Sequence, residues 1–244
     1  MKRFLLIFFS IFIFSFVKSQ LILDLESGAA AFGYNDVRIS GSEGTQFSLS
    51  TDFKNNVSPF FRARVQYNIG KRHSVLALYA PLTIKSNGIF QKDIYFQDVI
   101  FKAGYITNST WKFNSYRLTY QYNIIVKEKI LFAVGLTAKI RDAKIALSNS
   151  DMSAEKTNLG IVPLIRFYAD WKVAKKMHLI LDGDALVAKQ GRAEDILLAI
   201  GYDPIERLSI KLGYRLLEGG ADNDEVYNFS SVHYAAIGAS WTFK

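Results

Sequence analysis

Apolar and polar residues alternate over long stretches of the chain from Gln20 onward. Between positions 113 and 125, one set of alternate positions is mostly polar and the other is apolar or aromatic: Ser115, Arg117, Thr119, Gln121 and Asn123 against Tyr116, Leu118, Tyr120, Tyr122 and Ile124. Successive side chains of a β-strand point to opposite faces, so this pattern predicts a strand with one apolar and one polar face. The same period of two recurs in 130–140 and 208–216.

Ten segments with this patterning can be marked along the chain. They are 21–34, 57–69, 73–85, 112–126, 130–145, 158–172, 177–188, 193–203, 207–217 and 230–243. No stretch after Gln20 approaches the roughly 18 consecutive apolar residues of a membrane-spanning helix. We therefore predict an all-β fold of about ten long antiparallel strands.

The predicted connections alternate between short and long. Tight polar turns are expected at 70–72, 127–129, 174–176 and 204–206, a short link near 189–192, and longer links at 35–56, 86–111, 146–157 and 218–229. Transmembrane β-barrels show this alternation, with short turns on the periplasmic side and longer loops outside. The pattern favours a single antiparallel transmembrane barrel of ten strands. Because 46–53 and 94–102 also look strand-like, twelve strands is the alternative.

Aromatic residues help to separate a membrane barrel from a soluble lipocalin-like barrel, whose strands alternate in the same way. The apolar positions near the short turns and the carboxyl end carry Tyr67, Tyr122, Trp171, Tyr202, Trp241 and Phe243. Such clustering is typical of an aromatic girdle at one membrane interface. In a soluble barrel these rings would crowd one end of the lumen while arginines pointed outward. We therefore favour the membrane barrel.

The amino terminus has the features of a cleaved secretory signal. Lys2 and Arg3 precede a nearly unbroken apolar run over 4–17, and the small residues Val17 and Ser19 stand at −3 and −1 before Gln20. The run is shorter than the roughly 20 residues that a membrane-spanning helix needs. We predict a signal peptide over 1–19 and one barrel domain over 20–244.

Composition excludes several classes of protein. The chain is 50% hydrophobic and 14% aromatic, so it is not disordered, and it has no cysteine for a disulfide, a thiolate metal site or a lipid anchor. It has 30 basic and 22 acidic residues, and removal of 1–19 leaves 27 basic and 22 acidic. The excess is spread singly along strands without a basic run, so we expect no nucleic-acid partner.

The predicted signal, the alternating segments and the final strand 234–243 with its aromatic close resemble Gram-negative outer-membrane β-barrel proteins. The resemblance covers 20–244 and rests on patterning, not on a motif. It implies location in the cell outer membrane and contact with outer-membrane lipid, lipopolysaccharide and the barrel assembly machinery. The chain departs from the pattern because Lys244 follows Phe243, whereas such proteins usually end on the aromatic residue. Pro81 and Pro163 fall inside predicted strands, where we expect bulges.

The polar face carries charges of both signs, and we expect them to point into the lumen. The predicted charge network is Arg62, Arg64, Arg117, Arg166, Asp170, Asp182, Asp184, Asp195 and Arg215, and the same face also carries Asp24, Glu26, Lys139, Arg141 and Lys211. Folding about residue 175 places Arg166 opposite Asp184, and folding about residue 205 places Arg215 opposite Asp195. In a ten-stranded barrel these charges would meet as an internal plug, or they would line a passage for a small solute.

Candidate chemistry is sparse. Ser231 and His233 share a face, but this face points to lipid and offers no evident carboxylate partner. Asp182 and Asp184 loosely resemble the paired carboxylates of omptin-type proteases, at a depth near mid-barrel. Asp222, Asp224 and Glu225 are weak candidates for a Ca²⁺ or Mg²⁺ site, although a solvated loop explains them more simply. We predict no cofactor.

Two functional hypotheses follow from the sequence. The first is a non-enzymatic outer-membrane barrel with a structural or surface role, or a narrow channel for a small solute. The second is an outer-membrane hydrolase that acts on lipid or peptide at the extracellular mouth of the barrel. A general base is scarce in the long loops, where His233 lies only at an edge, so the first hypothesis is favoured.

Overall fold

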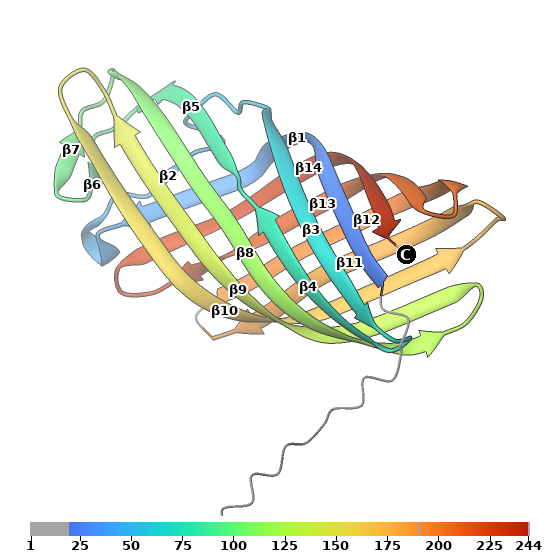
Figure 1. Cartoon of the computed structure of the whole chain (residues 1–244). Coiled ribbons are helices and arrows are strands. Elements are labelled where there is room, and N and C mark those ends of the chain that lie inside the picture. The colour runs from blue at the N-terminus through green and yellow to red at the C-terminus, as the bar shows by residue number, and fades with distance from the viewer. Residues whose placement is uncertain (1–19, 190, 244) are drawn as a thin grey trace, which may run out of the picture.

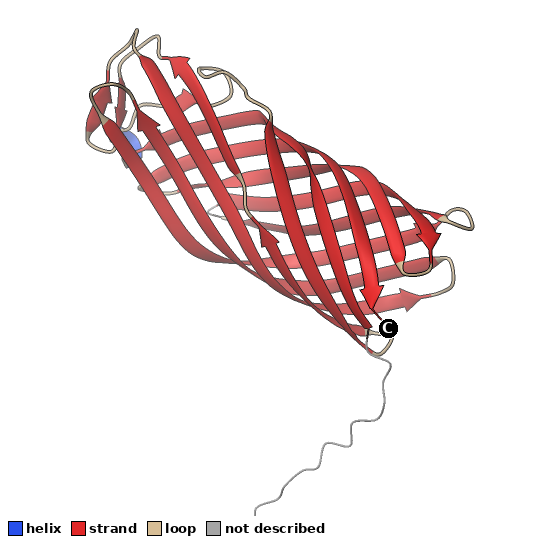
Figure 2. Cartoon of the chain, turned by 45° about the horizontal axis from the view of Figure 1, so that its top comes forward, coloured by secondary structure: helices blue, strands red, loops and turns tan. Residues whose placement is uncertain are grey.

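The structure is a computed structural model that describes residues 20–189 and 191–243. The predicted signal peptide at 1–19 lies outside the described residues. The described part is almost entirely strand, wound into a tilted barrel (Figures 1 and 2). No helix in it is long and apolar enough to cross a membrane.

The barrel wall is built by eleven strand segments: β1 (Gln20–Ile39), β3 (Ser58–Ile69), β4 (His73–Ala80), β5 (Thr83–Ile89), β8 (Ile106–Val126), β9 (Ile130–Ser148), β10 (Ser153–Lys172), β11 (Met177–Ala188), β12 (Gly191–Ile205), β13 (Leu208–Asp222) and β14 (Val226–Phe243). Each pairs antiparallel with its neighbours, and β14 pairs with β1 to close the ring. Both β4 and β5 pair with β8, one above the other, so they fill a single position in the wall. Residues 20–189 and 191–243 thus form a closed ten-stranded barrel, as predicted.

The strand-like pieces of the long links do not add to the wall, so the twelve-strand alternative is wrong. Within 46–53, β2 (Phe47–Ser48) adds only a two-residue ladder to β1. Within 94–102, β6 (Ile94–Phe96) and β7 (Val99–Phe101) pair only with each other, as a separate small sheet. A short helical turn, η1 (Gly41–Glu43), follows β1. These pieces contain too few residues in regular alternation to cross a membrane.

The two prolines behave differently. The wall is interrupted at Pro81 and Leu82, between β4 and β5, where a bulge was expected. Pro163 instead lies within β10 in unbroken register with Ala138 of β9, so the bulge predicted there is wrong. On its other side β10 has no ladder partner at this height, because its pairing with β11 begins only at Ile165. A residue without an N–H is tolerated along such a free edge.

The two ends of the barrel differ. We call the end with the short connections, where Gln20 and Phe243 also lie, the turn end, and the opposite end the loop end (Figure 1). At the loop end residues of the long links pack together in a buried apolar core, which we call the loop cluster. It comprises Phe47, Leu49, Phe53, Phe90, Ile94, Phe96 and Phe101, packed on Val37, Ile39, Ile84, Trp111 and Leu147 of the wall. Edge-to-face ring contacts, such as Phe53 on Phe90 at 5.1 Å, hold it together.

The wall is apolar outside and polar inside at mid-height. Exposed outward residues of β9 include Ile130, Leu136 and Ile140, whereas Thr137 and Lys139 on the inner face are buried. A soluble barrel would show the opposite arrangement. The alternation read from the sequence therefore places the charged residues inside the barrel.

Candidate functional site in the lumen

The lumen is crossed at mid-height by a set of buried ionic side chains that we call the charge layer. In the described chain it contains six cationic and five anionic side chains: Arg62, Arg64, Arg117, Arg166, Lys211 and Arg215 with Asp24, Glu26, Asp182, Asp184 and Asp195. They come from β1, β3, β8, β10, β11, β12 and β13, so the layer links nearly the whole circumference. Charges removed from water are tolerated only when they are paired and hydrogen-bonded, and these are.

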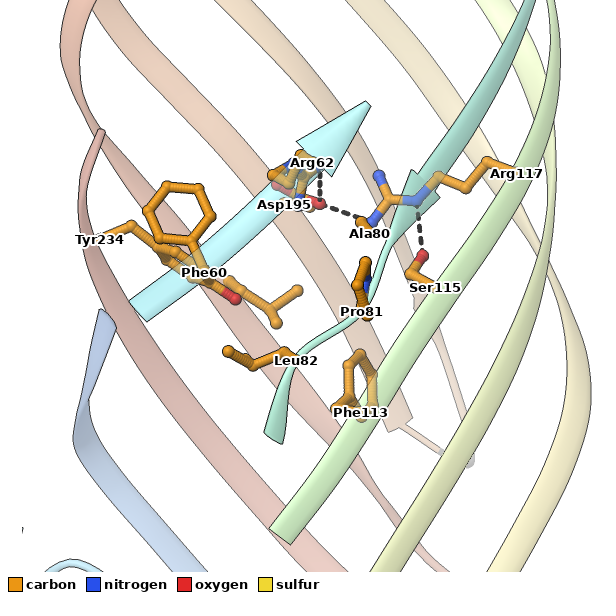
Figure 3. Close-up of a pocket in the computed structure, with 11 residues that line it drawn as sticks. Phe60, Arg62, Ala80, Pro81, Leu82, Phe113, Ser115, Arg117, Asp195 and Tyr234 are labelled. Atoms are coloured by element: carbon orange, nitrogen blue, oxygen red, sulfur yellow. Dashed lines mark hydrogen bonds and ion pairs between the residues drawn. The ribbon is translucent and has the colours of Figure 1, made fainter. Parts of the chain in front are cut away.

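Asp195 is the centre of the layer. Its carboxylate accepts from three guanidinium groups, with Arg117 Nη2 at 2.5 Å, Arg215 Nη1 at 2.6 Å and Arg62 Nη2 at 3.0 Å. Figure 3 shows Arg62 and Arg117 both reaching this carboxylate, while Arg117 Nε also donates to Ser115 Oγ at 2.9 Å. Asp195 is only 2% exposed. One carboxylate thereby ties β12 to three other strands of the wall, β3, β8 and β13.

Asp182 and Asp184 on β11 extend the layer. Arg117 Nη1 donates to Asp184 Oδ2 at 2.7 Å, and the Thr137 hydroxyl donates to the other oxygen at 2.7 Å. Asp182 binds Arg64 at 2.5 Å and also Arg166. Arg166 and Asp184 are Cα partners, in the predicted register, but the nearest carboxylate of Arg166 is Asp182, and Asp184 lies 4.0 Å away.

Glu26 and Lys211 complete the layer beside the β1–β14 seam. Arg215 binds Glu26 through two parallel bonds of 2.7 and 3.0 Å, and Lys211 Nζ lies 3.2 Å from Glu26 and 2.8 Å from Asp24. The sequence placed these residues on the inward face but did not include Glu26, Lys211 or Asp24 in the network. Their positions opposite the arginines depend on barrel closure, which strand alternation alone does not specify.

One predicted pairing has the wrong register. Arg215 lies opposite Leu197, and Asp195 lies opposite Leu217, so β12 and β13 are shifted by two residues from the prediction. The cause is the connection, because β12 runs on to Ile205 and β13 starts at Leu208, with a register shift between Tyr202 and Ile205. A shift of two keeps both side chains on the same face. Arg215 therefore still reaches Asp195, along a diagonal.

Asp170, which was also predicted in the network, lies apart from the charge layer, nearer the turn end. Its carboxylate contacts His178 Nδ1 at 2.9 Å and accepts from the Tyr168 hydroxyl at 3.2 Å. His178 Nε2 in turn lies 3.3 Å from Asp203. These groups line a cavity of about 330 Å³ that we call the turn vestibule.

The charge layer borders the turn vestibule on one side and a small pocket on the other. Arg64, Arg166 and Asp182 line the vestibule. Arg62, Arg117 and Asp195 instead line a small pocket on the other side of the layer, closed off by Phe60, Phe113 and Tyr234 (Figure 3). That pocket measures about 10 Å³, room for no more than one water molecule. Side chains thus fill the lumen at this height.

A larger cavity, which we call the loop chamber, lies between the charge layer and the loop end. It measures about 670 Å³ and is lined by Trp111, Lys139, Arg141, Val162, Leu186 and Leu217 among others. Known small-molecule sites span roughly 300–1,000 Å³ and combine apolar walls with a few placed polar groups. In size and lining the loop chamber falls within this range of ligand sites.

The six predicted girdle residues, Tyr67, Tyr122, Trp171, Tyr202, Trp241 and Phe243, follow the outer face near the turn end. Five of them are exposed, Trp171 most of all at 54%. Tyr122 is partly covered by His73 and by Arg72, whose guanidinium lies 5.9 Å from its ring centroid. The outer face thus carries a belt of large rings at this end, which we call the aromatic belt.

The weak metal candidates do not converge. Asp222 pairs with Arg38 at 3.7 Å, and Glu225 pairs with Lys156 of β10 at 2.8 Å. In 20–189 and 191–243 no group of three or more ligating side chains could hold a metal ion. Lys156 holds the pKa of the Glu225 carboxyl below its ordinary value by donating a hydrogen bond and by its charge. These acidic residues serve ion pairs at the loop end.

The hydrolase candidates lack a catalytic arrangement. Ser231 Oγ and His233 Nε2 are 3.4 Å apart on the outer face, and His233 Nδ1 contacts the Tyr214 hydroxyl, so no described carboxylate orients the ring. Asp182 and Asp184 lie deep in the charge layer, bound by arginines. Carboxylates held in this way are poor general bases, because protonation would break their ion pairs.

No protein-family model matches the chain, and no curated protein matches it. Solved structures do. The outer membrane protease OmpT from Escherichia coli superimposes with a TM-score of 0.58 at 9% identity, over 92% of this chain and 97% of that one. This chain has the fold of an outer-membrane β-barrel.

Two further outer-membrane structures align over most of their length. They are the translocator domain of the autotransporter NalP from Neisseria meningitidis, with a TM-score of 0.48 at 9% identity over 91% of this chain and 88% of that one, and Ail, the attachment invasion locus protein of Yersinia pestis, with 0.40 at 12% over 91% and 99%. At 9% identity the likeness to OmpT shows the fold alone. The activity of this barrel has to be argued from its lumen.

Proposed function

We propose that the protein is a non-enzymatic barrel of the Gram-negative outer membrane, closed at mid-height by the charge layer, and that it binds its ligand in the loop chamber. The observation that carries the proposal is the carboxylate of Asp195, held by three arginines beside a pocket of about 10 Å³. A solute would have to break several buried ion pairs to pass, and each costs several kcal/mol to disrupt.

The outer face supports the membrane location. Outward residues of β9 are apolar from Ile130 to Ile140, and Asp142 follows. This stretch matches the roughly 9–11 residues of a transmembrane β-strand. The aromatic belt borders it on the turn end, as an interfacial girdle would. In this orientation the turn end faces the periplasm, the loop chamber faces outward, and outer-membrane lipid and lipopolysaccharide surround the wall. Delivery would use the predicted signal peptide and the barrel assembly machinery.

Liposome swelling tests the closed lumen. Residues 20–244 are refolded into vesicles, and folding is checked by heat-modifiable migration on a gel. We expect vesicles with the protein to swell in small sugars and amino acids no faster than empty vesicles. The matched variant Arg117→Ser with Asp195→Ser removes one charge of each sign and should increase the rate. Rapid swelling with the unmodified protein would contradict the proposal and favour a narrow solute channel.

A hydrolase is the alternative. Its test is cleavage of lipid A or of peptides by the refolded protein, with His233→Ala as the variant. We expect no cleavage by either protein, because the described residues near Ser231 and His233 include no orienting carboxylate. Cleavage that is lost in His233→Ala would overturn the non-enzymatic proposal.

A further inference from the structure

The barrel wall is incomplete beside the loop chamber. Pairing between β10 and β11 ends at Ile165 with Ala185, whereas pairing between β10 and β9 continues to Ser153 with Ser148. Residues 153–164 of β10 therefore have no ladder partner on the β11 side. Figure 1 shows the yellow β9–β10 hairpin running on past the orange β11–β12 hairpin toward the loop end. Unpaired edges are rare in closed barrels, whose closure normally removes them.

The opening has a defined frame, and we call it the side window. Its lower limit is the Ile165–Ala185 pair, and its upper limit is the ion pair of 2.8 Å between Lys156 and Glu225, which joins β10 to the β13–β14 turn. The β11–β12 hairpin forms the remaining side. The Lys156–Glu225 pair thus joins β10 to the β13–β14 turn beyond the tip of the shorter β11–β12 hairpin.

The loop chamber reaches this window. Its lining includes Val162 and Ile161, which point to opposite faces of β10, together with Leu186 and Ala188 of β11. The outer rim of the window is apolar, with Leu159, Ile161 and Val187 each at least 74% exposed. Leu159 pairs with Asp142, where the apolar band of β9 ends. The window therefore spans the upper edge of the lipid-facing band and opens the chamber toward the outer leaflet.

The chamber also holds two basic side chains, Lys139 and Arg141, that form no ion pair with a carboxylate of the described residues. Lys139 is 2% exposed, and its Nζ lies 4.6 Å from the centroid of the Phe113 ring, which is its contact among the described residues in place of an ion pair. At the next inward position of β9, Arg141 donates to Asn158 Oδ1 at 2.5 Å and leaves its buried Nε without an acceptor. The carboxylate of Asp195 is already bound by three arginines. A buried basic group without a counter-charge is costly to ionise, and an anion bound beside it would supply that charge.

We propose that the loop chamber binds an anionic single-chain amphiphile. The headgroup, a carboxylate or a phosphate, pairs with Lys139 and Arg141, and the acyl chain lies along Val162 and Leu186 and passes through the side window to the outer leaflet. This inference rests on the proposed function, because that function places the ligand in the loop chamber, on the loop side of the charge layer. Charge and shape act together here, since the cations lie inside and the apolar rim faces lipid.

Fluorescence of Trp111 reports on occupancy, because this ring lines the chamber. The substitutions Trp171→Phe and Trp241→Phe leave it as the sole tryptophan of the chain. Brominated palmitate and a brominated lysophosphatidic acid supply the two anionic headgroups, and brominated palmityl alcohol supplies the same chain without charge. We expect both anions to quench Trp111 at concentrations at least about tenfold below those the alcohol requires, and the stronger of the two identifies the headgroup.

Substitution of the cations tests the headgroup site. Lys139→Met and Arg141→Met should each weaken quenching by the anions about tenfold or more and leave quenching by the alcohol unchanged. Lys172→Met, at the turn end of β10, is the matched control and should change nothing. Equal quenching by anions and alcohol, or wild-type affinity in Lys139→Met, would overturn the proposal.

The absence of cysteine from the described chain allows a clean test of the window. Pro163→Cys with Val187→Cys places thiols at the next outward positions beyond the Ile165–Ala185 pair, so a disulfide would draw the window closed. Oxidation should slow uptake of brominated palmitate from vesicles at least about tenfold, and reduction should restore it. The control pair Ala169→Cys with Leu181→Cys joins residues that are already partners. Unchanged uptake in the oxidised window variant would refute lateral entry.

The two proposals fail in different ways. If the vesicles do not swell and the anions do not quench Trp111, the closed lumen stands and the amphiphile site is rejected. Rapid swelling would reject the closed lumen whatever the quenching shows.

Discussion

Arg215 and Glu26 form a two-pronged ion pair across the seam where the barrel closes. The Arg215 Nε and Nη2 atoms donate to the two oxygens of Glu26 at 2.7 and 3.0 Å, spanning β14, which lies between their strands. Both side chains are at most 3% exposed. Because Arg215 also binds Asp195, the first and last parts of the chain are tied to the middle of the charge layer.

Removal of this carboxylate should weaken the barrel. Glu26→Gln leaves Arg215 and Lys211 buried with too little negative charge, and breaking such a pair typically costs about 3–5 kcal/mol. Urea unfolding in lipid vesicles, followed by heat-modifiable migration, measures the change. Glu128→Gln, in the exposed β8–β9 turn, should leave the midpoint unchanged. If Glu26→Gln has the same urea midpoint as Glu128→Gln and the wild type, the charge layer does not stabilise the fold.

The loop cluster should unfold separately from the wall. Phe96 is fully buried there, and Phe→Ala in a packed core costs about 3–5 kcal/mol. Phe96→Ala should therefore expose the β6–β7 hairpin to trypsin at Lys92 and Lys102 while heat-modifiability persists. Ile100→Ala, at a residue 48% exposed, is the control and should remain resistant. Loss of the folded band in Phe96→Ala would show that the cluster and the wall form one cooperative unit.

Gly28 should be essential for closure of the β1–β14 seam. Its φ of 143° disfavours other residues, and a Cβ there would lie 2.1 Å from the carbonyl oxygen of Ala235. Gly28→Ala should lower the free energy of unfolding by about 1–3 kcal/mol, measured from the urea midpoint in vesicles. In the control Gly160→Ala, the added Cβ would lie 3.3 Å from the flexible end of Arg141 and 3.6 Å from Asn158 Oδ1. Equal stability of the two variants would argue against a strained seam.

Acid should loosen the Lys156–Glu225 pair. Lys156 depresses the pKa of Glu225, so the pair is fully formed above the ordinary pKa of a glutamate and is lost as pH falls through the lowered value. Hydrogen exchange of residues 153–160, corrected for its intrinsic pH dependence, should be faster in Glu225→Gln at neutral pH. A fall in pH should then accelerate this corrected exchange in the wild type and leave it unchanged in Glu225→Gln. Slow exchange in the variant would show that this pair does not hold the edge of β10.

Much of the fold could be predicted because strand alternation repeats in long, regular segments. The three-residue turn at 174–176 gave the register of β10 and β11, and Arg166 and Asp184 are partners as a result. The irregular turn after Tyr202 shifted Arg215 by two residues, and only its long side chain restored contact with Asp195. Alternation sets the face of a residue, whereas the register depends on turn geometry.

The features of the loop end could not be predicted. Phe96 and Phe101 lie on strands of three residues, too short for a period to be recognised. The side window arises because β10 continues past the tip of the β11–β12 hairpin, and the sequence of β10 alone does not show which of its edges is paired. Lys139 was placed inside the lumen, but its lack of a partner depends on how three arginines share Asp195.

Single-channel recording in a planar lipid bilayer tests the closed lumen most directly. The refolded residues 20–244 should insert without unitary currents, whereas Arg117→Ser with Asp195→Ser should give brief openings through the gap left in the charge layer. Steady unitary currents from the unmodified barrel would contradict this account, because they require a continuous aqueous path past Asp195.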